Sequence, residues 1–112
     1  MSDCIFCQII NKEMPAQTVY EDEKIVVFKD IHPKARIHFL IVPKEHISSL
    51  ENVKDVSLLG QLIQIAKTVA KKFLLDKNGY KLIINVGEGG GQVVFHLHLH
   101  LLSGGELKTF PV

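Results

Sequence analysis

The chain has 112 residues, 46% of them hydrophobic, which is enough for one core, so we expect residues 1–112 to form a single domain. Thirteen basic and twelve acidic side chains give a net charge of +1, too little to attract nucleic acid. No basic stretch with a following apolar run opens the sequence, and no window reaches the ~20 apolar residues that span a bilayer. We therefore expect a cytoplasmic protein that binds neither nucleic acid nor membrane.

The first half of the chain predicts one short helix and three strands. The helix follows a candidate N-cap at Asp3 and ends before Pro15, because four apolar residues have helical spacing: Ile5, Phe6, Ile9 and Ile10. Alternating and β-branched residues predict three strands, with an acidic turn between the first two: residues 18–20, 24–28 and 37–42.

The second half predicts one long amphipathic helix followed by two strands. Between Asp55 and Leu75, apolar residues recur at helical spacing and form one stripe: Leu59, Leu62, Ile63, Ala66, Val69, Ala70, Phe73 and Leu74. Turn residues follow, and strands are predicted over residues 80–86 and 95–102. Short neighbouring strands with one long and one short helix predict an α+β fold with a five-stranded antiparallel sheet.

The last predicted strand has histidine at every second position. Because successive side chains of a strand point to opposite faces, His96, His98 and His100 should share one face. The leucines at 97, 99 and 101 should then enter the core beneath the long helix. Neighbouring imidazoles on one face are ~6.6 Å apart, which suits the two sides of a phosphate-sized group. One neutral ring can act as nucleophile while a protonated neighbour donates.

Two other interpretations of this row are a line of solvent-facing histidines and a set of metal ligands, since histidines at i and i+2 on a strand commonly bind zinc. The sequence Gly-Glu-Gly-Gly-Gly-Gln at residues 87–92 leads directly into the row. Glycines let backbone N–H groups converge on an anion, although such clusters are more often plain loops. Beside the histidines, this loop favours phosphoryl chemistry.

Four blocks of sequence carry a resemblance to a known family: residues 4–10, 28–33, 38–46 and 85–100. The last block is the most specific, because it contains Gly-Gly-Gln-x-x-x-His-x-His-x-His. Together they resemble the histidine triad (HIT) superfamily, and within it the Hint branch of purine nucleoside phosphoramidases. The resemblance implies a HIT-like fold, hydrolysis of P–N or P–O bonds in AMP or GMP derivatives, and a homodimer whose sheets join into one larger sheet.

The resemblance also implies roles for individual residues. His98 would form a covalent nucleotidyl intermediate, His100 would hydrogen-bond phosphate oxygens, and His38 would orient groups or relay a proton, although it is equally compatible with a buried core histidine. Asp30 would bind the ribose hydroxyls, although Asp is also a common turn residue. The other implied nucleotide-binding residues are Asn85, Gly91 and Val93 for phosphate and, as apolar walls that are equally compatible with core, Phe6, Ile9, Phe28, Ile31 and Leu40.

The only two cysteines, Cys4 and Cys7, are three residues apart, which in a reducing compartment favours metal or redox chemistry over a disulfide. Relatives with this pair complete a tetrahedral structural zinc with two histidines, which correspond here to His46 and His96. The resemblance thus implies a closed Zn²⁺ site that leaves His98 free for phosphate. Two buried thiols without a metal are the alternative.

Three departures from the family pattern concern the leaving group. Val93 stands where many relatives have a hydroxyl that helps to protonate the leaving group, so phosphoramidates of basic amines should turn over slowly. Glu106 stands in place of the usual arginine, and Phe110 in place of a tryptophan. Two other functions therefore stay open: a dinucleoside polyphosphate hydrolase, and a zinc-stabilised nucleotide-binding scaffold with little catalysis.

Overall fold

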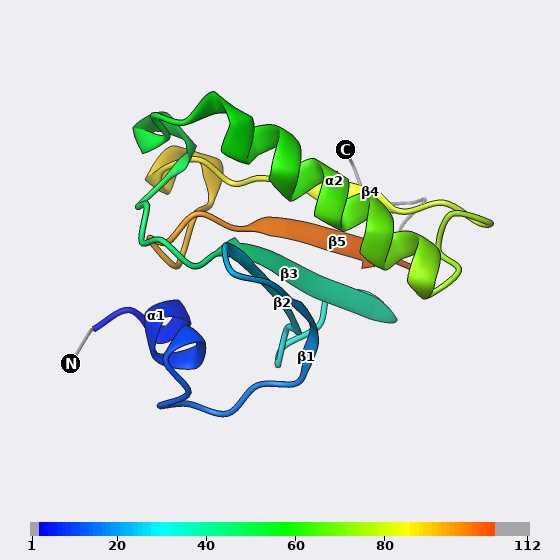
Figure 1. Cartoon of the computed structure of the whole chain (residues 1–112). Coiled ribbons are helices and arrows are strands. Elements are labelled where there is room, and N and C mark those ends of the chain that lie inside the picture. The colour runs from blue at the N-terminus through cyan, green and yellow to red at the C-terminus, as the bar shows by residue number, and fades with distance from the viewer. Residues whose placement is uncertain (1–2, 105–112) are drawn as a thin grey trace.

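A computed structural model describes residues 3–104, in which a five-stranded sheet has a helix on each face (Figure 1). The strand order is β1-β2-β3-β5-β4, and all neighbouring strands are antiparallel. The predicted α+β class, antiparallel sheet and pair of helices are confirmed. The elements are α1 (Ile5–Ile10), β1 (Thr18–Glu21), β2 (Ile25–Lys29), β3 (Ile37–Pro43), the 3₁₀ turn η1 (Leu50–Asn52), α2 (Val56–Lys72), β4 (Lys81–Ile83), the 3₁₀ turn η2 (Glu88–Gly90) and β5 (Leu99–Ser103).

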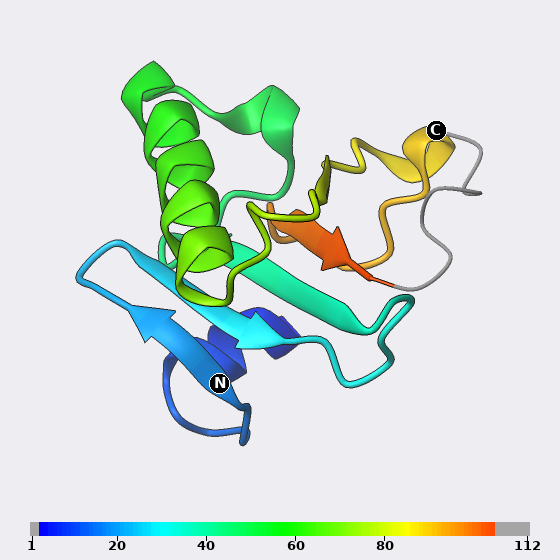
Figure 2. The ribbon, with the colours of Figure 1, turned by 90° about the vertical axis from the view of Figure 1, so that its right-hand side faces the viewer.

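The long helix α2 covers one face of the sheet (Figure 2). It begins after Asp55, whose carboxylate accepts a hydrogen bond from the Ser57 N–H at 3.0 Å. The side chains that α2 buries against the sheet are Leu58, Leu62, Ala66, Val69 and Ala70. Leu97, Leu99 and Leu101 meet them from below, as predicted, and burying each contributes roughly 2 kcal/mol.

The predicted stripe of α2 was wrong at its edges. Leu58 is buried, whereas Leu59, which the spacing favoured, is only half-buried. Ile63 is 40% exposed because it lies on the flank of the stripe. Leu74 is 66% exposed because the helix ends at Lys72 and Leu74 adopts a left-handed φ of 62° in the following turn. Neither α-helix within residues 3–104 has the length and apolar character needed to cross a bilayer.

The short helix α1 covers the opposite face, as Figures 1 and 2 show. Its Phe6 packs into a second apolar cluster with Val26, Phe28, Leu40 and Val42. The predicted cap was wrong, because the helix starts one residue later than a cap at position 3 requires. Its N-cap is the first cysteine of the pair, whose Sγ accepts a hydrogen bond from the N–H three residues on, at 3.3 Å.

The last two strands are shorter than predicted. β4 covers three residues, and β5 starts at Leu99, four residues after the predicted start. The preceding segment leaves the ladder because the Leu97 N–H donates to the Ile47 carbonyl at 2.7 Å. The side chains of this segment nevertheless keep the alternation. Leucines still face α2 and histidines still face the other side.

Candidate functional site

The three histidines predicted to be catalytic come together on the α1 face of the sheet. His98 and His100 have ring centroids 5.0 Å apart. His38, on the adjacent strand β3, has its centroid 5.1 Å from that of His100. His38 and His98 are buried and His100 is half-buried. A solvent-facing row of histidines is therefore ruled out for these residues.

One ring nitrogen of His98 is fixed by the backbone carbonyl of His96. Nδ1 lies 2.7 Å from the carbonyl oxygen of His96, and because a carbonyl can only accept, Nδ1 carries the proton and donates it. The neutral ring then has its lone pair on Nε2. Burial lowers the pKa of His98 and so favours the neutral form. The Phe6 ring packs edge-on against this ring, with the centroids 5.0 Å apart and an interplanar angle of 89°, which helps to hold the imidazole plane.

A chain of hydrogen bonds also sets the protons of the other two rings. The Lys34 N–H donates to Nδ1 of His38 at 3.1 Å, so the His38 proton is on Nε2. Nε2 lies 2.9 Å from Nδ1 of His100, which therefore accepts, leaving the His100 proton on its own Nε2. Burial lowers the pKa of His38, and burial followed by the neighbouring imidazoles lowers that of His100 to about 4. Both rings are neutral at pH 7, and His100 offers an N–H donor.

Asp30 lies beside this chain and also makes a turn. Its Oδ1 accepts a hydrogen bond from the His32 N–H at 2.8 Å, so the turn interpretation holds. Its Oδ2 lies 3.5 Å from Nε2 of His38. Because that imidazole is neutral, we treat the contact as a polar one and not as an ion pair. One carboxylate oxygen thus faces the histidines while the other holds the loop.

The apolar residues predicted to surround the base fall into two groups. Three of them are buried in the cluster under α1, where Ile9 packs against them, so they also serve as core: Phe6, Phe28 and Leu40. Ile31 is 82% exposed and makes no core contribution. An exposed apolar side chain next to Asp30 remains available to a ligand.

The glycine loop precedes the histidines and is built from left-handed backbone. Gly87 has φ 71° and Gly91 has φ 83°, conformations that favour glycine. Nδ2 of Asn85 donates to the Gly90 carbonyl at 2.9 Å, so this side chain holds the loop. Val93, which follows the loop, is 86% exposed. The structure thus places the predicted phosphate residues on one short, shaped segment.

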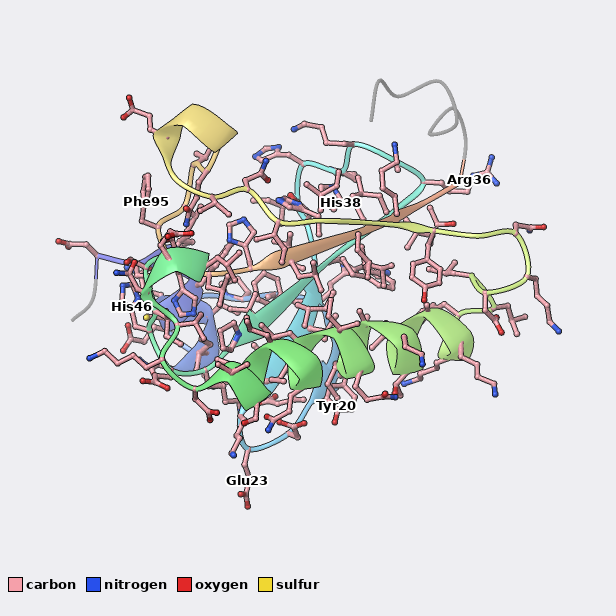
Figure 3. The ribbon with its side chains drawn as sticks, turned by 90° about the horizontal axis from the view of Figure 1, so that it is seen from above. Tyr20, Glu23, Arg36, His38, His46 and Phe95 are labelled. Carbon is pink, nitrogen blue, oxygen red and sulfur yellow. The ribbon has the colours of Figure 1, made fainter. Side chains whose placement is uncertain are left out.

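Four sulfur and nitrogen atoms converge at the other end of the histidine segment. The ligand atoms of Cys4, Cys7, His46 and His96 all lie within 4.8 Å of one another. Nδ1 of His96 lies 3.3 Å and 3.6 Å from the two sulfurs and 3.2 Å from Nδ1 of His46. Figure 3 shows His46 near α1, with His38 further along the sheet.

This donor set fits zinc. Tetrahedral zinc with bonds of about 2.0 Å to nitrogen and 2.3 Å to sulfur separates its ligands by about 3.3–3.8 Å, close to the distances found. Nε2 of His96 donates to the Pro43 carbonyl at 2.8 Å, which leaves Nδ1 as the lone pair that faces the sulfurs. The two cysteines are thus not isolated thiols.

Comparison with known proteins shows the family to which the chain belongs. The family model described as HIT domain matches residues 11–107. The chain belongs to the HIT domain family. Protein HitA from Neisseria gonorrhoeae is 49% identical to this HIT protein over 105 residues, covering 92% of the chain and 97% of HitA.

Two solved structures place this HIT protein among proteins of the same fold. A HIT family hydrolase from Legionella pneumophila Philadelphia 1 has a TM-score of 0.91 at 45% identity, covering 97% of this chain and 98% of that one. A histidine triad nucleotide-binding protein from Candida albicans has a TM-score of 0.83 at 39% identity, covering 88% and 73%. The predicted HIT superfamily and the predicted fold of the single chain are confirmed.

Sequence reasoning missed several groups that shape this HIT site. Three of them are backbone groups, the carbonyls of Pro43 and His96 and the N–H of Lys34, which no residue pattern reveals. The fourth is Gln92, a buried polar side chain in an exposed loop, for which its place in the Gly-Gly-Gln motif was the available signal. Glu106 and Phe110 lie outside the described residues.

Proposed function

We propose that this HIT protein is a hydrolase of the Hint type that cleaves purine nucleoside phosphoramidates and related AMP or GMP derivatives through a nucleotidyl intermediate on His98. The observation that carries the proposal is the hydrogen bond from Nδ1–H of His98 to the carbonyl of His96, which leaves a buried Nε2 lone pair beside the N–H of His100. Similarity to the Legionella hydrolase and to the Candida nucleotide-binding protein supports it.

The reaction follows in two displacements. Nε2 of His98 attacks phosphorus, an N–P bond forms, and the P–N or P–O bond to the leaving group breaks. Water then attacks phosphorus, the N–P bond breaks, and the nucleoside monophosphate is released with His98 neutral again. The His100 N–H and the loop amides hydrogen-bond the non-bridging oxygens as charge develops. Asp30 accepts hydrogen bonds from the ribose hydroxyls, and Ile31 covers the base.

Val93 limits which leaving groups depart easily. Its side chain has no proton to give, and the neighbouring imidazoles of His38 and His100 are neutral at pH 7. Leaving groups that depart as stable anions need no acid, whereas a basic amine must be protonated. We therefore expect phosphoramidates of basic amines to react slowly.

The group of two cysteines and two histidines has a structural role in this proposal. Cys4, Cys7, His46 and His96 would hold Zn²⁺ and supply a closed tetrahedral crosslink between α1, the end of β3 and the histidine segment. A reducing compartment keeps the thiols available, which supports a cytoplasmic location.

The edge of the sheet supports a homodimer. β4 lies at one edge of the five-strand order, and pairing two such edges would join the two sheets. On α2, Val56 is 75% exposed and Ile63 is 40% exposed, apolar surface that a second copy would cover. Sedimentation of the chain as a monomer at micromolar concentration would contradict this part of the proposal.

The direct test is to incubate the purified chain with adenosine 5′-phosphoramidate and detect AMP. We expect catalytic release of AMP at a modest rate, because ammonia is a basic leaving group that Val93 cannot protonate. Hydrolysis of diadenosine triphosphate without hydrolysis of the phosphoramidate would favour a dinucleoside polyphosphate hydrolase. Tight AMP binding without product at high enzyme concentration would favour a nucleotide-binding scaffold.

A further inference from the structure

Gln92 is the polar side chain of the glycine loop that the mechanism leaves without a role. Only 5% of it is exposed, although the residues on both sides of it are exposed. A primary amide offers one acceptor oxygen and two N–H donors, and here all are used. Oε1 accepts from the Gly87 N–H at 2.8 Å, while Nε2 donates to the carbonyls of Ser48 at 2.7 Å and Val94 at 3.0 Å.

These bonds close the loop and hold the backbone on both sides of Val93. The Gln92 N–H also donates to the Gly87 carbonyl at 3.0 Å, so the two residues exchange a pair of hydrogen bonds. The bond to Val94 fixes the chain on the far side. The N–H of Val93 has no hydrogen-bond partner among residues 3–104, and its side chain is 86% exposed. The direction of this N–H therefore depends on Gln92.

We propose that Gln92 is a positioning residue for phosphate recognition, which holds the loop from Gly87 to Val93 so that the Val93 N–H is aimed at a phosphoryl oxygen. The inference rests on the proposed function and deepens it. A donor that is held in place before the anion arrives loses no freedom on binding, whereas a mobile loop amide must be ordered first. An exposed valine cannot order that amide by packing.

The hydrogen bonds of Gln92 also join the loop to a second part of the site. Ser48 follows His46 by two residues, and the carbonyl between them, that of Ile47, accepts the Leu97 N–H. Gln92 makes no hydrogen bond to Asp30, and it meets the apolar cluster under α1 only through the carbonyl of Val94, whose side chain packs against that cluster. Its loss should therefore weaken binding of the phosphate and leave binding of the nucleoside nearly unchanged.

The test uses two variants of the full chain and one matched control. Gln92→Glu keeps the size and the acceptor for Gly87, but places a carboxylate oxygen against the two carbonyls. Gln92→Met keeps the volume and removes every hydrogen bond of the side chain. The control is Gln64→Glu, which makes the same glutamine-to-glutamate change at an exposed position of α2. Calorimetry gives the Kd of AMP and of adenosine for each protein.

We expect both Gln92 variants to raise the Kd of AMP at least tenfold, equivalent to about 1.4 kcal/mol, with the Kd of adenosine changed less than twofold. Gln64→Glu should change neither. Equal losses for AMP and adenosine would show a merely structural role and overturn the inference, as would an unchanged AMP affinity. If the wild-type chain does not prefer AMP to adenosine, the proposed function fails as well.

A measurement on the wild-type chain covers the case in which the variants do not fold. In NMR spectra, addition of AMP should shift the Val93 amide proton strongly while the side-chain NH₂ signals of Gln92 stay in place. A Val93 amide that does not respond to AMP overturns the inference.

Discussion

His96 and His98 belong to two different clusters of side chains, although they are only two residues apart. The two rings differ in which nitrogen donates a hydrogen bond to a backbone carbonyl. At His96, Nε2 donates to the Pro43 carbonyl, so Nδ1 faces two sulfurs and another imidazole. At His98, Nδ1 donates to a carbonyl, so Nε2 is the basic atom. In the proposed function, the same residue type, two positions apart, would thereby serve as a metal ligand in one case and as a nucleophile in the other. The carbonyl that accepts from each ring, more than the residue type, separates the two kinds of chemistry.

The largest expected effect comes from removing the nucleophile. His98→Ala should lower kcat/KM on adenosine 5′-phosphoramidate by on the order of 10³ or more, because the proposed intermediate forms on the His98 ring. The Kd of AMP should change by less than about tenfold, or ~1.4 kcal/mol. His32→Ala, at an exposed histidine, serves as the control. Retained turnover in His98→Ala would refute the assigned role.

Removing a sulfur at the other cluster should affect stability more than chemistry. Cys7→Ala should lose zinc, measured by metal analysis, and lower Tm by about 10 °C, which corresponds to roughly 2 kcal/mol in a domain of this size. His98→Ala should keep its zinc, so the two variants separate the clusters. Folded wild-type protein that contains almost no zinc would retire the four-ligand assignment.

The third prediction concerns how the free energy of unfolding depends on pH. Burial lowers the pKa of His100 to about 4, from an ordinary value near 6.5, so the unfolded chain binds a proton that the folded chain does not. The stability contribution is complete above pH 6.5 and is lost as pH falls toward 4. Urea unfolding should show this decline, on the order of 2 kcal/mol, and His100→Gln should decline less. If the free energy of unfolding falls equally with pH in the wild type and in His100→Gln, the lowered pKa is wrongly assigned to His100.

The smallest effect is expected at Asp30, whose two oxygens have different tasks. Asp30→Asn should weaken AMP about fivefold, or ~1 kcal/mol, because an amide replaces one acceptor for the ribose hydroxyls. Binding of 2′,3′-dideoxy-AMP should be unaffected, since it lacks those hydroxyls. An equal loss for both nucleotides would mean that Asp30 acts only through its turn.

Much of the fold could be predicted because it depends on periodicity. The alternation of histidine and leucine from 96 to 101 predicts both faces of the segment, and the stripe of α2 predicts its burial to within a few residues. The start of β5 could not be predicted in this way. Leu97 leaves the ladder for the Ile47 carbonyl, a contact between distant segments that propensity does not encode.

The site was predicted in part, and the reason is chemical. Side chains such as Cys4 and His46 are visible in the sequence, and the structure brings them together as predicted. The cap of α1 was misplaced because Asp is the better capping residue in general, whereas here the helix begins after Cys4. Gln92 was overlooked because its partners are main-chain groups of three separate positions.

The bond from His98 to the carbonyl of residue 96 has a consequence for protein engineering. Every amino acid has that carbonyl, so no side-chain replacement at 96 deletes the acceptor that orients the His98 ring. His96 can therefore be exchanged to alter the proposed zinc site while the hydrogen-bond partner of His98 stays in the chain. Reorienting that neighbour would require rerouting the main chain itself.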